Sequence, residues 1–508
     1  MNAAADTLSA ALGDLGARGE AIAVRPADGP PLTYSELDQR ASRLRSALSG
    51  LGLGPGDRFA FMLPNGSRIL ECYLACARGG FAAVPISDRL APGELIGQLR
   101  SAGVSAVLCG EGATELAQAE RELEATRIAL VPGTGAPDYE ALLAAAAPDP
   151  DPVGEPDDLL CLMYTGGTTG VSKAAMQTQR SWASCVRSVA AEWALRSSDR
   201  HLVVLPMDHV SWFTSASILA VGGELLLEPG WDPERVLTRI EAERVTTLNM
   251  IPTMLGDLLA TLPAEGGPDL SSLRLLTVAG SPMPAEMYER ARAVFGPIIG
   301  CIYGLTETSG PVTYLLPGDL SVERLRSGGR PGAEVELRIL GEDGNPAATD
   351  EPGEILLRGP QVTSGYLGMP EETEAAFLEG WFRTGDVGRV DGDGFLYIVD
   401  RSKDMVKSGG FNVYPKEVEE VLYAHPGVRE ASVVGVSDPR WIEAVHAGVV
   451  LSAPAAATEA ELIAHCRAHL PGYKVPKAIH IESSLPRTKV GKPDKRALRD
   501  RFNTLVSE

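Results

Sequence analysis

Residues 159–174 read LLCLMYTGGTTGVSKA. The apolar start has the composition of a buried strand, and the next ten positions hold three glycines, three threonines and a lysine. An ordinary buried turn does not need so many residues that adopt positive φ or offer a hydroxyl. A Gly/Thr loop behind a strand offers N–H and O–H donors that wrap phosphate oxygens. The GxxxxGKS or GxxxxGKT pattern of a Walker A loop is absent, and taken alone the stretch fits a mobile surface loop equally well.

The chain before this loop alternates strands with helices. The predicted strands are 58–63, 80–87, 104–110 and 127–133, with helices at 67–79 and 113–126. Strands separated by helices of this length indicate parallel α/β layers. Residues 136–158 are rich in Ala, Pro and Asp and predict a surface linker.

The pattern changes twice after the loop. The α/β alternation runs to about residue 316, and from 328 short strands with Gly-rich turns predict a small β-rich subdomain. A compact α+β unit then follows the stretch VDRSKD at 399–404. Its predicted helices are 415–424 and 458–469, and its predicted strands are 430–436, 444–451 and 478–482. We therefore predict an α/β fold in two domains. A large N-terminal domain of layered α/β subdomains and the β-rich subdomain covers 1–400, and a small mobile α+β domain covers 401–508.

Composition limits the classes of partner. The 508 residues are too many for one core. Lys+Arg 46 against Asp+Glu 67 gives a formal charge of −21, which argues against nucleic acid or an anionic membrane surface as a partner. The seven cysteines are scattered, without CxxC pairs or histidines at metal spacing, as in a reducing compartment. We see neither signal peptide nor membrane span and expect a cytoplasmic protein.

Four further stretches carry groups suited to a nucleotide. YGLTE at 303–307 ends in Glu307, a carboxylate able to hold a metal ion between phosphates, although alone it fits a solvated loop. WFRTGD at 381–386 ends in Asp386, which can accept from both ribose hydroxyls. The other two are DRSKDMVKSGGFNVYPKEVE at 400–419 and PRTKVGKPDKR at 486–496, which holds Lys492.

In this order, and together with the glycine loop, these motifs resemble the adenylate-forming (AMP-binding) enzymes, in the branch of the acyl- and aryl-CoA synthetases. The resemblance covers essentially the whole chain. It implies ATP, Mg²⁺, CoA and a small-molecule carboxylic acid as ligands, with acyl-AMP and then a thioester as products. Because acyl-AMP is already activated for attack by a thiol, no side-chain nucleophile is needed, which fits the absence of a GxSxG or Cys/His arrangement.

The resemblance also implies a role for each matching position. The loop around the β- and γ-phosphates is Thr165, Gly166, Gly167, Thr168, Thr169, Gly170 and Lys173. The residues that flank the adenine are Gly280, Ser281, Pro282, Cys301, Ile302, Tyr303 and Gly304. Thr306 would touch the α-phosphate, Glu307 and Thr165 would bind Mg²⁺, and Asp386 and Arg401 would hold the ribose. Lys492 would bridge the carboxylate and the α-phosphate. For the CoA step, Lys403 would be the pivot of a domain rotation, and Gly409 and Gly410 would lie beside the pantetheine arm.

The chain departs from the usual family pattern in a few places. Gly167 stands where serine is frequent, Ser172 replaces proline, Ala174 replaces glycine, and Ile302 stands where glycine is common. None of these changes removes a charged catalytic group.

The acid pocket implied by the family lies along 207–216, 251–254, 278–281 and 301–304. Its predicted lining is His209, Trp212, Phe213, Val278, Ala279, Gly280 and Ile302, with His209 also a candidate catalytic residue. The rings of His209, Trp212 and Phe213 would stack on an aromatic substrate, and packing or gating is their alternative role. The bulk of these side chains favours an aromatic or cyclic acid over a long fatty acid. The lining offers no Arg or Lys for a dicarboxylate.

Other functions remain open at this stage. SGGFNVYPKEVE resembles the CoA-ligase form of its segment, which favours CoA over a carrier protein as the acceptor. The alternatives are a stand-alone enzyme that loads a carrier protein and a medium- or long-chain fatty acyl-CoA synthetase. A nucleotide-binding pseudoenzyme is remote, because such a protein is expected to have lost Lys492, Glu307 or Asp386. The assembly is expected to be a monomer or a homodimer.

Overall fold

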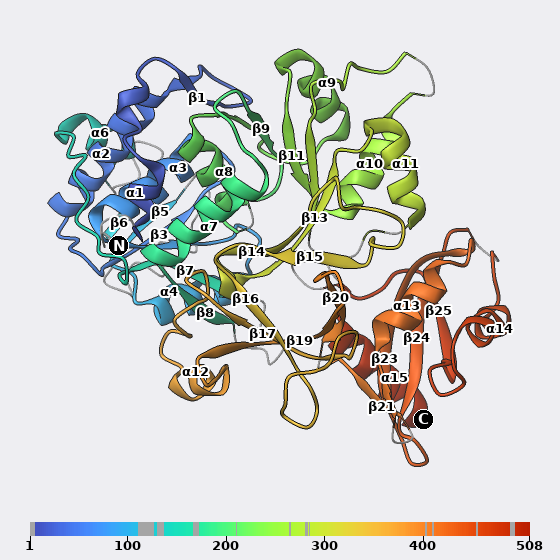
Figure 1. Ribbon diagram of the computed structural model, residues 1–508. Helices are drawn as coiled ribbons and strands as arrows, with labels where there is room; N and C mark the ends of the chain where they lie inside the picture. The colour runs from blue at the N-terminus through green and yellow to red at the C-terminus, as the bar shows by residue number, and fades with distance from the viewer. Residues whose placement is uncertain are drawn as a thin grey trace. The chain divides into compact units, whose positions relative to one another are not determined.

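The structure is a computed structural model that describes residues 6–109, 126–129, 137–165, 172–209, 211–263, 266–279, 283, 285–401, 404–408, 411–453, 456–487 and 493–507. The chain forms two compact units (Figure 1). The first unit comprises Met1–Leu337 and Leu357–Phe382, and the second comprises Arg338–Leu356 and Arg383–Glu508. The predicted domain boundary at 400/401 remains a prediction.

One sheet of the first unit has the strand order β6-β5-β3-β4-β7-β8. Its strands are β3 (Arg58–Met62), β4 (Ala82–Pro85), β5 (Ala106–Cys109), β6 (Thr126–Ala129), β7 (Leu159–Thr165) and β8 (Lys173–Thr178). All neighbours pair in parallel except β7 and β8, which are antiparallel. The connecting helices are α2 (Tyr34–Gly50), α3 (Ser67–Gly79) and α4 (Pro92–Ala102). The sequence therefore correctly predicts parallel α/β layers here.

The other sheet of the first unit runs β15-β14-β13-β12-β11-β9-β10-β1-β2. Its strands are β1 (Ile22–Arg25), β2 (Leu32–Thr33), β9 (Arg200–Val203), β10 (Glu224–Leu227), β11 (Thr247–Met250), β12 (Leu275–Val278), β13 (Ile299–Leu305), β14 (Gly310–Leu315) and β15 (Ser327–Pro331). Its helices are α7 (Gln179–Glu192), α8 (Ser211–Val221), α9 (Pro233–Glu243), α10 (Pro252–Thr261) and α11 (Ala285–Phe295). In the run β13-β12-β11-β9-β10-β1 all neighbouring strands are parallel, so their carboxyl ends lie at one edge of the sheet.

One apolar core joins the two sheets of the first unit. It contains side chains from both sheets and from helices α1 (Leu8–Leu12), α3, α7 and α8. Helix α8 is apolar on nearly all sides, and its residues from Ser211 to Leu219 are buried. A helix without a polar face is stable only inside the protein. Its side chains therefore pack against their neighbours all round.

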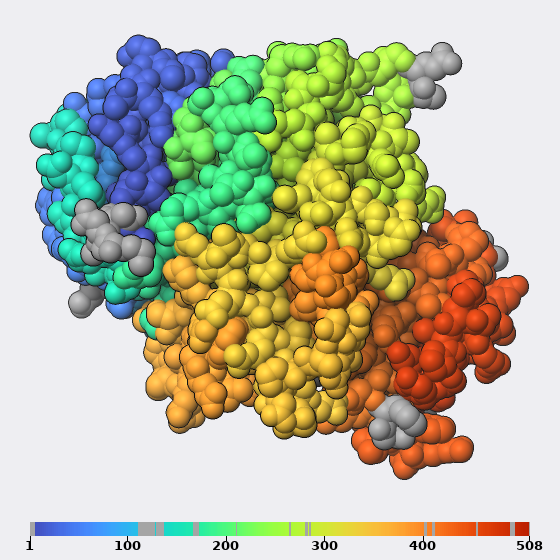
Figure 2. Space-filling model, in the orientation of Figure 1, coloured from blue at the N-terminus to red at the C-terminus, as the bar shows by residue number. Residues whose placement is uncertain are grey.

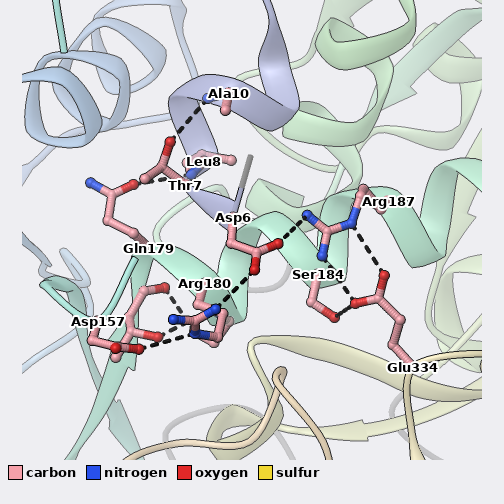
Figure 3. A network of polar contacts seen from close by, with 12 residues as sticks. Asp6, Thr7, Leu8, Ala10, Asp157, Gln179, Arg180, Ser184, Arg187 and Glu334 are labelled. Carbon is pink, nitrogen blue, oxygen red and sulfur yellow. Dashed lines mark hydrogen bonds and ion pairs between the residues drawn. The ribbon is translucent and has the colours of Figure 1, made fainter. Parts of the chain in front are cut away.

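The start of α7 is tied to the N-terminal segment by polar contacts (Figure 3). Asp6 forms ion pairs with Arg180 at 2.9 Å and with Arg187 at 3.5 Å, and Arg187 also pairs with Glu334 at 3.1 Å. The amide of Gln179 accepts from the backbone N–H of Leu8 and donates to a backbone carbonyl of α3. Because α7 follows β8 without a break, these contacts also fix the end of β8.

The prediction of a surface linker at 136–158 is partly wrong, because this segment contains helix α6 (Tyr139–Ala145). Asp138 caps this helix by accepting from Ala141 N–H at 2.8 Å. Tyr139 is buried and its hydroxyl donates to the fully buried carboxylate of Glu71 at 2.6 Å. Figure 2 shows the stretch around α6, in cyan, lying against the blue N-terminal part of the chain. The predicted helix at 113–126 falls almost wholly outside the described residues.

The second unit contains two groups of strands. The first follows the order β16-β17-β19-β20, with β16 (Glu336–Leu340), β17 (Gly353–Arg358), β19 (Trp381–Val390) and β20 (Leu396–Arg401), of which β16, β17 and β19 extend two residues beyond the limits of this unit. The α+β part follows the order β22-β21-β24-β23, with β25 also on β24. Its elements are β21 (Val406–Ser408), β22 (Phe411–Val413), α13 (Pro415–Tyr423), β23 (Val428–Asp438), β24 (Ile442–Leu451), α14 (Glu459–His469), β25 (Ala478–Glu482) and α15 (Lys495–Ser507).

Sequence patterning located most of these C-terminal elements to within a few residues, but it did not predict α15. The segment 364–382 holds two shorter elements, α12 (Pro370–Ala375) and β18 (Phe377–Leu378). Across the described residues, no helix is long and apolar enough to cross a membrane.

Candidate active site

The two ends of the predicted phosphate loop lie side by side. Strands β7 and β8 pair so that Thr165, the last residue of β7, stands opposite Lys173, the first of β8. The loop residues between them, Gly166, Gly167, Thr168, Thr169 and Gly170, lie outside the described residues. The described strands therefore place the threonine hydroxyl and the lysine ammonium at the same end of one strand pair.

Thr306 and Glu307 form a short helical turn, η3 (Thr306–Thr308), beside these two strands. The side chain of Gln177 on β8 donates to the carbonyl of Thr306 at 2.6 Å. The backbone N–H of Thr363 donates to the carbonyl of Glu307 at 2.7 Å. The structure thus brings together Thr165, Lys173, Thr306 and Glu307, which sequence analysis assigned to the phosphates and the metal.

Tyr366 is a neighbour of Glu307 that the sequence did not reveal. Its hydroxyl donates to Oε1 of Glu307 at 2.9 Å, and its ring centroid lies 5.0 Å from Nζ of Lys173. Burial, and secondly the negative charge of Glu307, raise the pKa of Tyr366 well above its ordinary value. The hydroxyl therefore stays protonated and remains a donor. The only signal in the sequence is a Gly-Tyr pair in a loop, and this does not predict which carboxylate the tyrosine meets.

The residues predicted to flank the adenine come from β13 and from the end of β12. Gly304 lies so close to β14 that a Cβ would stand 2.3 Å from the carbonyl oxygen of Gly310. Tyr303 is buried, and Ile302 is half-buried and packs against the core. Val278 pairs with Cys301 across the two strands, so Ala279 follows at the same edge. Gly280, Ser281 and Pro282 lie outside the described residues.

The structure places Trp212 in the core and gives no support to its predicted stacking on a substrate. The indole is 0% exposed and stacks on Tyr73, with ring centroids 4.1 Å apart and planes within 5°. Phe213 meets Trp193 edge to face at 6.1 Å. Trp212 and Phe213 are both buried on α8, which agrees with packing, their alternative role, while their contact with a substrate remains a prediction. His209, just before α8, has an exposed side chain and remains a candidate.

In the second unit, Asp386 on β19 stands opposite Arg401 on β20. Asp386 is 4% exposed. The side chain of Arg401 and the predicted residues Lys403, Gly409, Gly410 and Lys492 lie outside what the structure describes. Cross-strand pairing agrees with a shared role at the ribose but does not test it.

Two half-buried lysines, both near Asp400, were missed by the sequence analysis. Nζ of Lys416 donates to Ile398 O at 3.1 Å, and burial lowers the pKa of Lys416 although Asp400 and Asp386 oppose the shift. Nζ of Lys495 pairs with Glu419 at 2.9 Å. Burial lowers the pKa of Lys495, but the neighbouring carboxylates outweigh burial and raise it overall. Both lysines begin or nearly begin a helix, and a helix-start lysine gives no signal of burial.

The chemistry of the donors fits a magnesium ion held jointly with a nucleotide. Thr165 and Glu307 supply a hydroxyl and a carboxylate, which are hard oxygen ligands. Within the described part of the chain, no group of three or more His, Cys, Asp or Glu side chains is arranged to hold a metal. Mg²⁺ with nucleotides uses one or two protein carboxylates, with phosphates and water completing the shell.

Known proteins are similar to this chain in both sequence and fold. The family model described as AMP-binding enzyme matches residues 15–367, and that of the AMP-binding enzyme C-terminal domain matches 417–492. Feruloyl-CoA synthase from an Amycolatopsis species is 40% identical over 484 residues, covering 93% of this chain and 94% of that protein. A medium/long-chain-fatty-acid–CoA ligase from Mycobacterium tuberculosis is 36% identical over 491 residues, covering 93% of this chain and 86% of that protein.

A solved structure gives the same result. ATP-bound MatB from Rhodopseudomonas palustris superposes with a TM-score of 0.89 at 31% identity, over 97% of this chain and 99% of that chain. The family models, the relatives and the fold agree along nearly the whole sequence. The chain therefore belongs to the AMP-binding enzyme family and, within it, to the branch of the acyl- and aryl-CoA synthetases.

Proposed function

We propose that the protein is an AMP-forming carboxylic acid–CoA ligase whose acid is aromatic or cyclic. One observation carries the proposal: β7, β8 and η3 bring Thr165, Lys173, Thr306 and Glu307 together around the ends of a Gly/Thr loop. The relative at 40% identity, a feruloyl-CoA synthase, supports the aromatic class.

The first step joins two anions. A carboxylate oxygen attacks the α-phosphorus of ATP, a new P–O bond forms, and the bond to pyrophosphate breaks. Bringing like charges into contact costs on the order of 4 kcal/mol per pair in a semi-polar site. Lys492 would offset this repulsion by contacting both the carboxylate and the α-phosphate. Mg²⁺, when bound, would neutralise phosphate charge and act as a Lewis acid.

Other side chains of this first step position the nucleotide. Lys173 and the N–H groups of residues 166–170 would receive the leaving pyrophosphate. Thr306 would donate to the α-phosphate, while Asp386 and Arg401 would hold the ribose. The product is acyl-AMP, a mixed anhydride with AMP as its leaving group.

The second step transfers the acyl group to sulfur. The thiol of CoA loses its proton, sulfur attacks the acyl carbon, and the bond to AMP breaks. Lys403 at the predicted domain junction would serve as the pivot that withdraws Lys492. Gly409 and Gly410 would let the pantetheine arm pass close to the backbone because they carry no Cβ.

A second candidate is a fatty acyl-CoA synthetase, favoured by the relative from M. tuberculosis at 36% identity. The half-buried Ile302, which packs against the core, argues for a shorter pocket. The acceptor is a second open point, since a carrier-protein thiol would undergo the same chemistry.

The test is acid-dependent ATP–pyrophosphate exchange with benzoates, naphthoates, cinnamates and fatty acids, followed by thioester formation with CoA. We expect exchange with an aromatic acid and a CoA thioester as product. Lys492→Ala should remove most of the exchange and retain ATP binding, whereas Lys477→Ala, a substitution at an exposed lysine just before β25, should change neither. Exchange with fatty acids alone favours the second candidate. No exchange with any acid, or full exchange by Lys492→Ala, overturns the proposal.

A further inference from the structure

The segment that carries Tyr366 runs along β8. Leu367 N–H donates to Ala174 O at 3.0 Å, Met176 N–H to Gly365 O at 2.9 Å, and Ser364 N–H to Met176 O at 3.1 Å. These three bonds fix the backbone on both sides of Tyr366 relative to the strand that begins with Lys173. The backbone of Tyr366 is therefore held in a fixed position relative to β8.

Glycine at position 365 allows the backbone of this segment to follow its path along β8. Its φ is +132°, and a Cβ there would lie 2.4 Å from Cγ2 of Thr373 on α12. The hydroxyl of Thr373 accepts from the N–H of Tyr366 at 3.0 Å and donates to Met369 O at 2.8 Å. Only a residue without a side chain lets α12 approach closely enough to make these contacts.

The same segment holds Glu307 at two points. Thr363 N–H donates to the Glu307 carbonyl at 2.7 Å, and the Tyr366 hydroxyl donates to Oε1 of the Glu307 carboxylate at 2.9 Å. Tyr366 is 9% exposed, so little water competes for this bond. A hydrogen bond to a carboxylate is stronger than one between neutral groups. With Oε1 engaged, the carboxylate presents Oε2 in one direction.

The ring of Tyr366 also contacts the lysine of the phosphate loop. Nζ of Lys173 lies 5.0 Å from the ring centroid, within the range of a cation–π interaction. One side chain thus joins the cation assigned to the phosphates with the carboxylate assigned to the metal.

We propose that Tyr366 is the positioning residue of the magnesium–nucleotide site: its hydroxyl orients Glu307 toward the metal and its ring holds Lys173 near the phosphates. This inference rests on the proposed function, which makes Glu307 a metal ligand. Mg²⁺ accepts little deviation from octahedral geometry, so a carboxylate held in one orientation binds it better than a rotating one. The hydroxyl acts only when the metal is present, whereas the ring acts on the nucleotide in either case.

That difference gives a test by calorimetric binding of ATP, without acid, in excess Mg²⁺ and in EDTA. Tyr366→Phe keeps the ring and loses the hydroxyl. Its affinity for ATP in EDTA should therefore stay within about twofold of the wild type, while the increase in ATP affinity on adding Mg²⁺ should be about tenfold smaller. Tyr366→Leu loses both and should also weaken binding in EDTA. Tyr288→Phe is the matched control, because its hydroxyl donates to Leu320 O at 3.2 Å elsewhere in the same unit.

A double-mutant comparison separates this inference from the function beneath it. Glu307→Gln should lose the gain from Mg²⁺, and adding Tyr366→Phe to it should change nothing further, because the hydroxyl acts through Glu307. If Tyr366→Phe keeps the full gain while Glu307→Gln loses it, the role of Tyr366 is wrong and the function stands. If Glu307→Gln also keeps the full gain, both are wrong.

Discussion

The buried imidazole of His201 should make the free energy of unfolding depend on pH, and replacing this residue should remove its contribution. His201 lies on β9, between β10 and β11, and is 2% exposed. Its Nδ1 lies 2.9 Å from the hydroxyl of Thr247 on β11. Burial lowers the pKa of His201 from 6.5 to about 4, although the nearby carboxylate of Asp199 opposes the shift. The folded protein therefore keeps this imidazole neutral.

The size of the effect follows from the two pKa values. Below pH 6.5 the unfolded chain binds a proton at this histidine, and the folded chain does not until about pH 4. The unfolded state thus binds more protons in this window, so stability falls as the pH falls. The contribution is fully present above pH 6.5. A difference of about 2.5 pKa units corresponds to about 3 kcal/mol, lost progressively down to pH 4.

The assay is urea unfolding of the wild type and His201→Asn between pH 4 and pH 8. Asparagine does not titrate and retains a polar group for Thr247. The stability of the wild type relative to the variant should fall by about 3 kcal/mol from pH 7.5 to pH 4, with a slope near 1.4 kcal/mol per pH unit at most. A constant difference between wild type and His201→Asn across this range would falsify the reasoning.

Two further substitutions, each with a control, test close packing beside the site and a buried ion pair elsewhere in the first unit. A Cβ on Gly304 meets the Gly310 carbonyl, so Gly304→Ala should lower the free energy of unfolding by about 1–3 kcal/mol. Gly318→Ala, with no atom within 4 Å, should leave the urea midpoint unchanged, and equal midpoints for both variants would contradict this. Arg40→Met leaves the buried Glu71 carboxylate without its ion pair at 2.9 Å and should cost about 3–5 kcal/mol. Arg68→Met removes an exposed ion pair and a contact with the Tyr139 ring at 5.9 Å, and should cost less, about 1 kcal/mol, in thermal melts of the same variants.

Periodicity predicted the elements whose apolar pattern reflects their burial. Helix α3 and strand β25 have the predicted bounds, because a Gly-Gly pair ends the first and turn residues flank the second. Helix α6 was missed because half of the ten residues between Pro137 and Pro148 are alanine, and alanine gives no marked amphipathic pattern. Its place depends on Tyr139 finding Glu71, a partner 68 residues away in the chain. Pairing over such distances leaves no local signal.

The candidate site shows the same limit. Thr165, Lys173, Thr306 and Glu307 stand in recognisable motifs, so their chemistry was predictable. The contacts that hold them come from residues with no motif of their own, such as Gln177 and Thr363. A glutamine in a strand or a threonine in a loop is compatible with many roles. Only the fold shows that both donate to the backbone of η3.

The packing of Trp212 shows that an aromatic residue near a predicted pocket can serve the core, whereas its contact with a substrate remains a prediction. Helix α8 is apolar on nearly all sides, and such a helix must find packing partners for every face. The indole meets this need by stacking on Tyr73, and the stacked pair sits beside Trp182. Discrimination among acids is then expected to depend on residues that are less tightly packed than Trp212. Ile302 in the middle of β13 and Ala279 just after β12 are both half-buried, so exchanging them should change which acid is activated, whereas changing Trp212 should lower stability first.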